Sequence, residues 1–279
     1  MIDQSVLQKV LGEAMRTGGE FAEVFAEDRR NSSALLDDGR VEELTSGRDR
    51  GAGIRVVSGE TTGFAHTADL SEEGLLQAAR AAAAAAQGST GGTNVVALQS
   101  RTANRGYAIE KIPAEIAKAK KVELLLQANE AARAAGSAIS QVSVSYGDAA
   151  RHILIANSDG VFVEDDTIRT FFAVSCVAAG DTGMQTGRES IGHTVGFELF
   201  DMYDVEEMAR IAAGRALTKL SARPAPSGQM PVVIGSGGGG VLFHEACGHG
   251  LEADLVSKGA SVFRGRVGER VASPGVTVV

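Results

Sequence analysis

Two of the five histidines in this chain lie in the segment LFHEACGHGL, at residues 242–251, which follows the glycine-rich run GSGGGG. His244, Glu245 and His249 form the pattern H-E-x-x-x-H. Imidazole nitrogens are common zinc ligands, and a glutamate beside them can take a proton from water. These residue types in this order indicate a metal site with a carboxylate that can act on water.

The spacing of the two histidines sets a condition on the backbone. In the familiar zinc-peptidase pattern H-E-x-x-H, the histidines are four residues apart and lie on one helix face. Here they are five apart, which places them about 140° apart around an ideal helix. One extra residue in the turn, as in a π-bulge, would bring both imidazoles to one ion. Gly248 and Gly250 weaken the helix where this is needed.

Several alternatives remain for the residues around this motif. The segment could instead be a buried helix whose histidines are satisfied by hydrogen bonds. Cys247 lies three residues after His244, so it is either a further ligand or a small packing residue. Glu252 and Asp254 either orient the imidazoles or lie on a solvated helix face.

The glycines before the motif allow a second hypothesis, a phosphate cradle. Gly235, Gly237 and Gly240 have the spacing of a dinucleotide-binding fingerprint, but the histidine segment occupies the place of the nucleotide. The Lys-Ser or Lys-Thr of a P-loop is absent here. The glycines are better explained by close backbone packing, or by helix N–H groups exposed to a substrate carbonyl.

The elements that must position this motif come in two similar sets. Apolar and polar residues alternate around Asp38-Gly39, and again around Asp159-Gly160, which predicts two β-hairpins. Each hairpin follows a helical segment and precedes more strand-like sequence and a helix that opens on acidic residues. The pattern predicts an α+β fold, with two duplicated helix–β-meander–helix units followed by the start of a catalytic domain with a metal-binding helix.

Composition shifts suggest the domain boundaries. We expect the first unit over residues 1–94, the second over 110–222, and the start of a third domain over 229–279, after the linker SARPAPSGQ. That third part should begin with a strand, MPVVIG, and the chain ends on the strand-like sequence GVTVV. Because no turn or partner strand follows, the last domain looks cut short.

The composition narrows the class of protein. Of the 279 residues, 44% are apolar and 22% are charged, which is typical of a globular chain with a substantial core. A formal charge of −8 argues against a nucleic-acid-binding surface. Neither a signal peptide nor a transmembrane run is expected, and two distant cysteines do not make a disulfide framework. We therefore expect a cytoplasmic protein that binds neither nucleic acid nor membrane.

The segment HEACGHGLEAD, after a glycine-rich turn and a duplicated N-terminal region, resembles the TldD/PmbA family of metalloproteases, specifically its TldD branch. The resemblance implies that His244 and His249 bind zinc and that Glu245 is the catalytic general base. It also implies a third ligand, a cysteine beyond residue 279, since neither Cys176 nor Cys247 takes its place. Two imidazoles alone would hold zinc weakly.

The resemblance further implies a partner subunit, in a homodimer or in a heterodimer with a PmbA/TldE-like paralogue. Two functions follow. The first is zinc-dependent hydrolysis of peptides or unfolded polypeptides, with a chain that is incomplete. The alternative is a non-catalytic partner or regulatory module of a TldD/PmbA-like complex, because most of the chain consists of the duplicated meanders.

Overall fold

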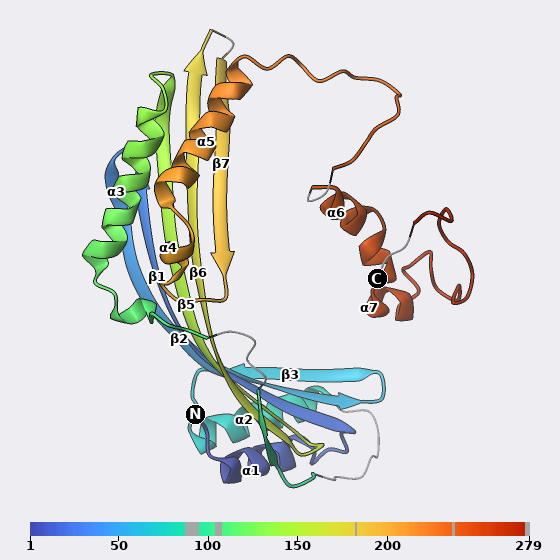
Figure 1. Cartoon of the computed structure of the whole chain (residues 1–279). Helices are drawn as coiled ribbons and strands as arrows, with labels where there is room; N and C mark the ends of the chain where they lie inside the picture. The colour runs from blue at the N-terminus through green and yellow to red at the C-terminus, as the bar shows by residue number, and fades with distance from the viewer. Residues whose placement is uncertain (87–94, 104–107, 182, 236–237, 277–279) are drawn as a thin grey trace. The chain divides into compact units, whose positions relative to one another are not determined.

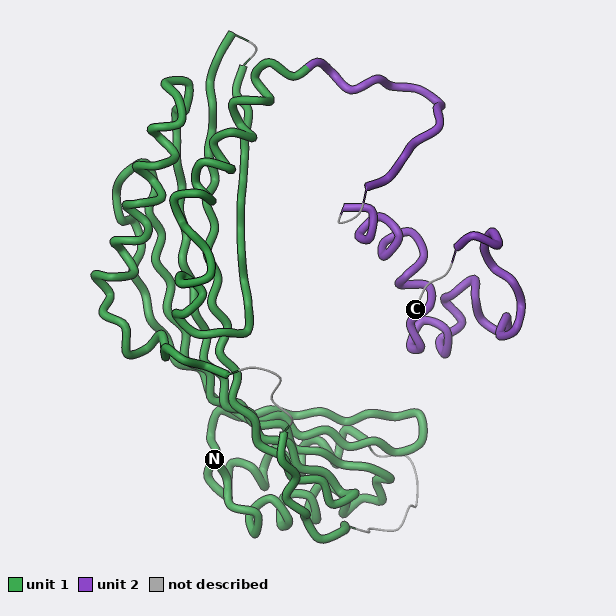
Figure 2. Tube along the Cα trace, viewed as in Figure 1, with its two compact units in different colours: residues 1–222 green, residues 223–279 purple. Residues whose placement is uncertain are grey.

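The computed structural model describes residues 1–86, 95–103, 108–181, 183–235 and 238–276. Contacts divide the chain into two units, residues 1–222 (unit 1) and 223–279 (unit 2), which Figure 2 colours separately. Each unit is described by itself.

Unit 1 combines helices with one large, mainly antiparallel sheet, as the α+β prediction requires (Figure 1). Its first half contains α1 (Gln4–Ala14), β1 (Phe21–Asp37), β2 (Arg40–Ser58), β3 (Thr61–Thr67) and α2 (Glu72–Ala85). Its second half contains a 3-10 turn, η1 (Pro113–Glu115), then α3 (Lys118–Ala134), β5 (Ile139–Asn157), β6 (Val161–Gly180), β7 (Gly183–His193), α4 (Leu199–Met202) and α5 (Val205–Leu220). A short strand, β4 (Gln99–Thr102), lies between the halves.

The strands form one sheet in the order β3-β2-β1-β5-β6-β4, and β7 also pairs with β6. Both predicted hairpins are confirmed: β1 and β2 turn at Asp38-Gly39, and β5 and β6 turn at Asp159-Gly160. Asp38 and Gly39 have φ angles of 48° and 82°, which suit the tight turns that join twisted antiparallel strands. The two hairpins meet where β1 pairs with β5.

Two hydrophobic cores share one face of this sheet. Side chains alternate between the faces of a strand. The even-numbered residues Ala22, Val24 and Ala26 of β1 belong to the core beneath α1 and α2. Ala34 and Leu36, farther along the same face, belong to the core beneath α3 and α5. The long strands thus carry a helix pair at each end, as Figure 1 shows.

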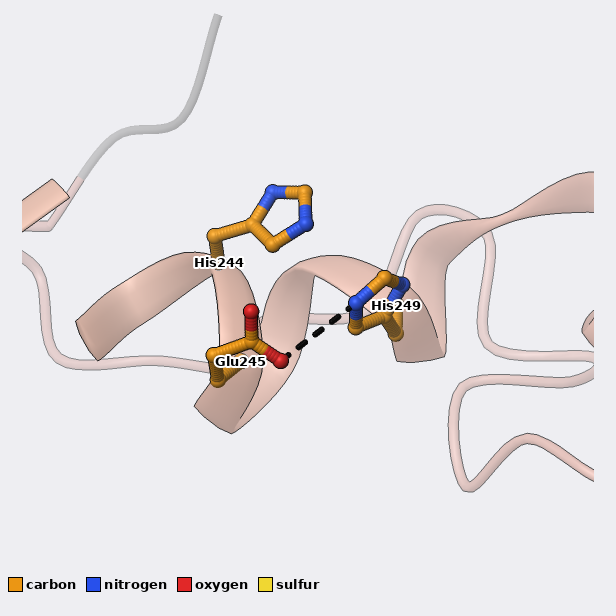
Figure 3. Close-up of side chains that lie close together, drawn as sticks. All are labelled: His244, Glu245 and His249. Atoms are coloured by element: carbon orange, nitrogen blue, oxygen red, sulfur yellow. Dashed lines mark ion pairs between the residues drawn. The ribbon is translucent and has the colours of Figure 1, made fainter. Parts of the chain in front are cut away.

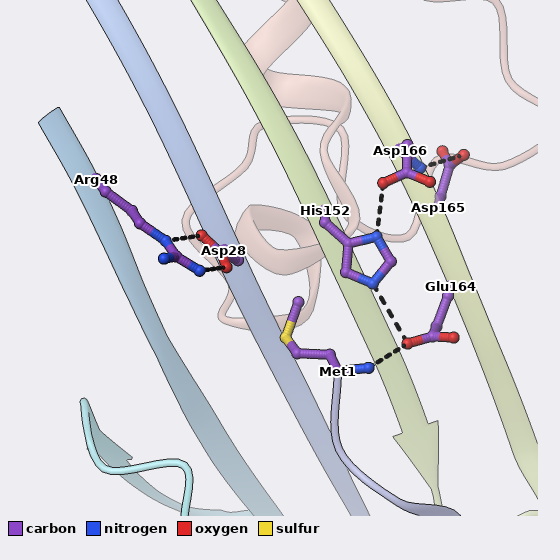
Figure 4. A network of polar contacts seen from close by, with 7 residues as sticks. All are labelled: Met1, Asp28, Arg48, His152, Glu164, Asp165 and Asp166. Carbon is purple, nitrogen blue, oxygen red and sulfur yellow. Dashed lines mark hydrogen bonds and ion pairs between the residues drawn. The ribbon is translucent and has the colours of Figure 1, made fainter. Parts of the chain in front are cut away.

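Polar side chains fill part of the region between the two cores (Figure 4). Arg48 binds the Asp28 carboxylate through two nitrogens. The His152 ring nitrogens lie 2.6 Å from Asp166 Oδ1 and 3.3 Å from Glu164 Oε1, and the N-terminal amine donates to Glu164 at 3.2 Å. These pairs satisfy charges at the middle of the sheet, where apolar packing is interrupted.

The second unit of the chain contains short helical elements. These are α6 (Gly238–Phe243), a π-helix (His244–Gly248), the 3-10 turn η3 (His249–Leu251) and α7 (Ala253–Ser257). None of the helices that the structure describes is long and apolar enough to cross a membrane.

Two local predictions differ from the structure. MPVVIG forms no strand, because it has no strand partner among the described residues, and Val233 is 99% exposed. The stretch between the two expected units, where no element was expected, contributes β4, which pairs in parallel with the start of β6. The glycine-rich segment 88–94, at the end of the first expected unit, and the last three residues of GVTVV lie outside the described residues.

The helix following each meander packs directly on a glycine of its third strand. A Cβ atom on Gly63 would lie 2.0 Å from the carbonyl oxygen of Ala82 in α2. A Cβ atom on Gly187 would lie 2.0 Å from the carbonyl oxygen of Ala212 in α5. Both contacts are with helix backbone, which cannot move aside as a flexible side chain can.

We expect Gly63→Ala and Gly187→Ala each to lower the free energy of unfolding by about 1–3 kcal/mol, because each added methyl forces a helix away from the sheet. The matched control is Gly12→Ala in α1, where a Cβ atom has nothing within 4 Å. This control should raise stability by roughly 0.5–1 kcal/mol through helix propensity. Urea unfolding of the three variants tests the packing; equal effects at all three sites would contradict it.

Candidate metal centre

The backbone of the H-E-x-x-x-H segment adopts the extra-residue turn that its spacing demands. His244–Gly248 form a π-helix, in which the backbone N–H of His249 donates to the carbonyl of His244. This bond spans five residues rather than the four of an α-helix. The turn therefore compensates for the five-residue spacing and returns the second histidine toward the first.

The side chains of the motif converge (Figure 3). One ligand atom from each of His244, Glu245 and His249 lies within 4.8 Å of the others. The two imidazole rings are 4.5 Å apart between centroids and inclined at 74°. All three side chains are exposed, so this cluster is not a buried helix with internally satisfied histidines.

Glu252 orients one of the imidazoles. Its Oε1 lies 2.9 Å from Nδ1 of His249. When Nδ1–H donates to this carboxylate, Nε2 carries the free lone pair, which is the arrangement of many metal-binding histidines. Nε2 lies 3.5 Å from Oε2 of Glu245. Glu252 therefore has the contact expected of an orienting residue.

The same carboxylates affect protonation of the histidine. The hydrogen bond and charge of Glu252, followed by the charge of Glu245, raise the pKa of His249 above its ordinary value of 6.5. A proton and a metal ion compete for the same nitrogen. Metal binding at this site therefore has to displace a proton that is held more firmly than on a free histidine.

The donor set suits zinc. Imidazole nitrogens are borderline-soft donors and a carboxylate oxygen is a hard donor. Zinc accepts this combination of ligands. Among the described residues, the cluster contains no cysteine. Cys247 donates its thiol to the carbonyl of Phe243 at 3.2 Å. Cys176 is buried in the sheet core, where burial raises the pKa of its thiol to about 11.

The other candidate residues lie apart from the motif. Asp254 pairs with Lys258 at 3.5 Å, which is the contact of a solvated helix-face acid. The three remaining histidines are on strands of unit 1: His66 on β3, His152 on β5 and His193 on β7. Part of the glycine run before the motif, residues 236–237, is outside the described residues.

The glycines within the motif have different surroundings. A Cβ atom on Gly248 would make only ordinary contact with the His244 ring, at 3.7 Å. Gly248 therefore loosens the turn without being required by packing. A Cβ atom on Gly250 would lie 2.9 Å from the ring of Phe263. Gly250 thus permits a close approach that sequence reasoning did not identify.

Comparison with known proteins identifies the family of the chain. The family described as PmbA/TldA metallopeptidase matches the chain in three domains: domain 1 at residues 22–86, the central domain at 111–220 and the C-terminal domain at 227–279. The chain belongs to the TldD/PmbA family of metallopeptidases.

Individual relatives carry matching names. The chain is 36% identical to a "Metalloprotease TldD homolog" of Haemophilus influenzae over 93% of this chain and 55% of the relative. It is 34% identical to a "Metalloprotease" of Methanothermobacter thermautotrophicus over 93% of this chain and 56% of the relative. The chain thus spans about half the length of these relatives.

A solved structure shares the fold. TldE from Thermococcus kodakarensis superimposes with a TM-score of 0.67 at 14% identity, covering 96% of this chain and 60% of that one. At this identity the likeness concerns the fold alone.

The contact between Glu252 and His249 generates a test by NMR. In metal-free protein, the His249 imidazole should titrate with a midpoint above 6.5. Glu252→Gln should lower that midpoint toward 6.5, because the amide no longer stabilises the imidazolium by its charge. Asp254→Asn serves as a control of equal charge change and should leave the midpoint in place. An unchanged midpoint in the Glu252 variant would show that this carboxylate does not hold the ring.

Proposed function

We propose that this chain carries the His-Glu-His part of a zinc-dependent metallopeptidase site of the TldD type, which hydrolyses peptides or unfolded polypeptides. One observation carries the proposal. The π-helix brings ligand atoms of His244, Glu245 and His249 within 4.8 Å of one another, although the sequence spacing alone would separate them.

Each residue has a defined task in this proposal. His244 and His249 hold the ion through imidazole nitrogens, and Glu252 keeps Nε2 of His249 free to bind. A bound zinc ion would supply Lewis-acid polarisation of water and of the peptide carbonyl. Glu245 accepts the proton of the attacking water and passes it to the leaving amine.

The contact between Glu245 and His249 supports the role of Glu245 as base. Oε2 of Glu245 lies 3.5 Å from Nε2 of His249, the nitrogen that a metal would occupy. An ion bound at that nitrogen would displace any proton held there and would hold its bound water within reach of the Glu245 carboxylate. Glu245 would then be available to water beside the ion.

A catalytic zinc ion usually has three protein ligands and one open position. The described cluster offers two histidines, with the glutamate reserved as base. We propose that a cysteine beyond residue 279 completes the site, as the family resemblance implies. The chain covers 55% of the Haemophilus influenzae relative, so that relative has residues outside the matched part in which such a ligand can lie.

The alternative, a non-catalytic partner module, has less support. The cited relatives are named metalloproteases, and the chain keeps all three residues of the motif. We propose that the protein acts in the cytoplasm as a homodimer or with a PmbA/TldE-like paralogue. The likeness to a TldE structure supports a shared fold for such a pair.

We also propose that the two helix–meander–helix sets of unit 1 are structural repeats. In each set, a glycine of the third strand packs on the backbone of the following helix, Gly63 on α2 and Gly187 on α5. The helices open on equivalent caps, because Ser71 and Asp204 each accept a hydrogen bond from the first turn. These two similarities support repeats that scaffold the peptidase.

Two substitutions in the intact natural protein test the roles. Glu245→Gln should keep the fold and zinc content, while peptide hydrolysis falls by roughly 10²–10⁴-fold, because an amide cannot accept the proton. His244→Ala should lose zinc and activity together, because it removes a ligand. Zinc content, melting temperature and peptidase rate are measured for both.

The matched control is His66→Ala, which removes an exposed histidine of β3 outside the cluster. It should keep zinc and activity. Full activity in Glu245→Gln would exclude this residue as the base. Unchanged zinc content in His244→Ala would exclude it as a ligand.

A further inference from the structure

Unit 1 contains a cavity that the peptidase site does not use. It has a volume of about 650 Å³ and lies between the start of α3, the η1 turn and the middle of strands β1, β2 and β5. Arg30 and Ser32 of β1 line it, on the face of the sheet that also carries the two cores. The cavity therefore lies beside the start of α3, over the part of the sheet between the two cores.

A buried ion pair forms part of the cavity lining. Lys121 of α3 is only 4% exposed, and its Nζ lies 2.7 Å from Asp148 Oδ2 and 2.8 Å from Ser32 Oγ. The Tyr146 hydroxyl donates to the same carboxylate oxygen at 2.7 Å. Because the lysine and aspartate compensate each other, this network is close to neutral and fixes the shape of the site.

The remaining charges of the lining are positive. Arg48 is compensated by Asp28, to which it donates through two nitrogens. Arg30 and Lys118 have no ion-pair or hydrogen-bond partner for their side chains among the described residues. Arg30 also lies within electrostatic reach of Asp28, so that one carboxylate faces both Arg48 and Arg30. Beside the Lys121–Asp148 pair, the lining thus has an excess of positive charge in a chain whose formal net charge is −8. Such a local excess attracts an anionic group.

The rest of the lining is largely apolar. Leu44 and Ile112 are 39% and 43% exposed, although both are large aliphatic residues. Pro113, Ala114, Ile116 and Ala150 extend this apolar wall. Ligand sites of this size commonly combine apolar walls with a few placed charges.

We propose that this cavity binds the carboxylate end of an apolar peptide segment, with Arg30 and Lys118 on the carboxylate and the aliphatic wall on the side chains. The inference deepens the proposed function, on which it rests, by naming a feature of the peptide that the protein binds. Arg30 offers a planar fork of donors that matches a carboxylate, and Lys118 adds a mobile charge. The aliphatic wall favours a ligand with an apolar body over a bare inorganic anion.

Binding can be measured separately from catalysis. The intact natural protein is treated with a chelator so that hydrolysis cannot consume the probe. The probe is a fluorescent peptide that ends in leucine and valine, prepared with a free C-terminal carboxylate and with a C-terminal amide. Anisotropy should show at least about tenfold tighter binding of the free acid at low salt, as charge-assisted hydrogen bonds predict.

Substitutions then assign the preference to the cavity. Arg30→Gln with Lys118→Gln should bring the acid and amide affinities together while leaving the melting temperature unchanged, because both side chains are exposed. The matched control, Arg40→Gln with Arg223→Gln, makes the same charge change outside the cavity and should keep the preference.

Three outcomes would overturn the proposal. Equal affinity for acid and amide would remove the carboxylate from recognition. A preference that persists in the Arg30/Lys118 variant would place recognition elsewhere. Inorganic phosphate could also displace the fluorescent peptide as effectively as the unlabelled peptide acid does. That result would show that the cavity binds anions without an apolar body. The zinc content and peptidase rate of the Glu245→Gln variant test the proposed function without the peptide-binding assay. A failure of the cavity proposal can therefore be distinguished from a failure of the proposed function.

Discussion

The antiparallel pairing of β1 with β5 is the interaction on which unit 1 depends. It runs from Glu23–Asn157 to Asp37–Ser143 and joins two hairpins that are far apart in sequence. Each of the two cores takes residues from both hairpins, and the sheet is continuous only through this pair. At its centre Arg29 lies opposite Arg151, whose Nε donates to Glu27 at 2.8 Å. The like charges are thus partly compensated within the sheet.

The metal centre depends on local geometry rather than on a core. Gly239 is the only buried residue among the described residues of unit 2. The positions of His244 and His249 are therefore set by the π-helix, by the contact with Glu252 and by the approach of Phe263 to Gly250. A metal ion that joins both imidazoles would add a constraint to this segment, which couples binding to local order.

Local features of the sequence predicted much of this architecture. The alternation around Asp38-Gly39 and Asp159-Gly160 gave the hairpins, because side-chain period and turn chemistry are local properties. The five-residue spacing of the histidines required an extra residue in the turn, and the π-helix supplies it. The closing helix of each unit was predicted to open on acidic residues, and Asp204 accepts hydrogen bonds from the backbone N–H groups of Glu206 and Glu207 at the start of α5.

Features that depend on long-range pairing were not predicted. Four residues of β4 form a strand only because β6 lies beside them, and no periodicity marks such a short segment. MPVVIG has strand-like composition, but composition does not provide a partner strand. The cavity depends on contacts that join Lys121 of α3 to Asp148 of β5, 27 residues away, and to Ser32 of β1, 89 residues away. No local pattern distinguishes Lys121 from its exposed neighbours on the helix.

X-ray absorption at the zinc edge tests the central claim most directly. The intact natural protein is loaded with one equivalent of zinc, and its spectrum is compared with that of the doubly substituted His244→Ala, His249→Ala protein. The account predicts two imidazole nitrogens at roughly 2.0–2.1 Å from zinc in the natural protein. In the double variant, the spectrum should lack the contribution of these two nitrogens. A zinc spectrum that is the same in both proteins would contradict the assignment of His244 and His249 as the ligands.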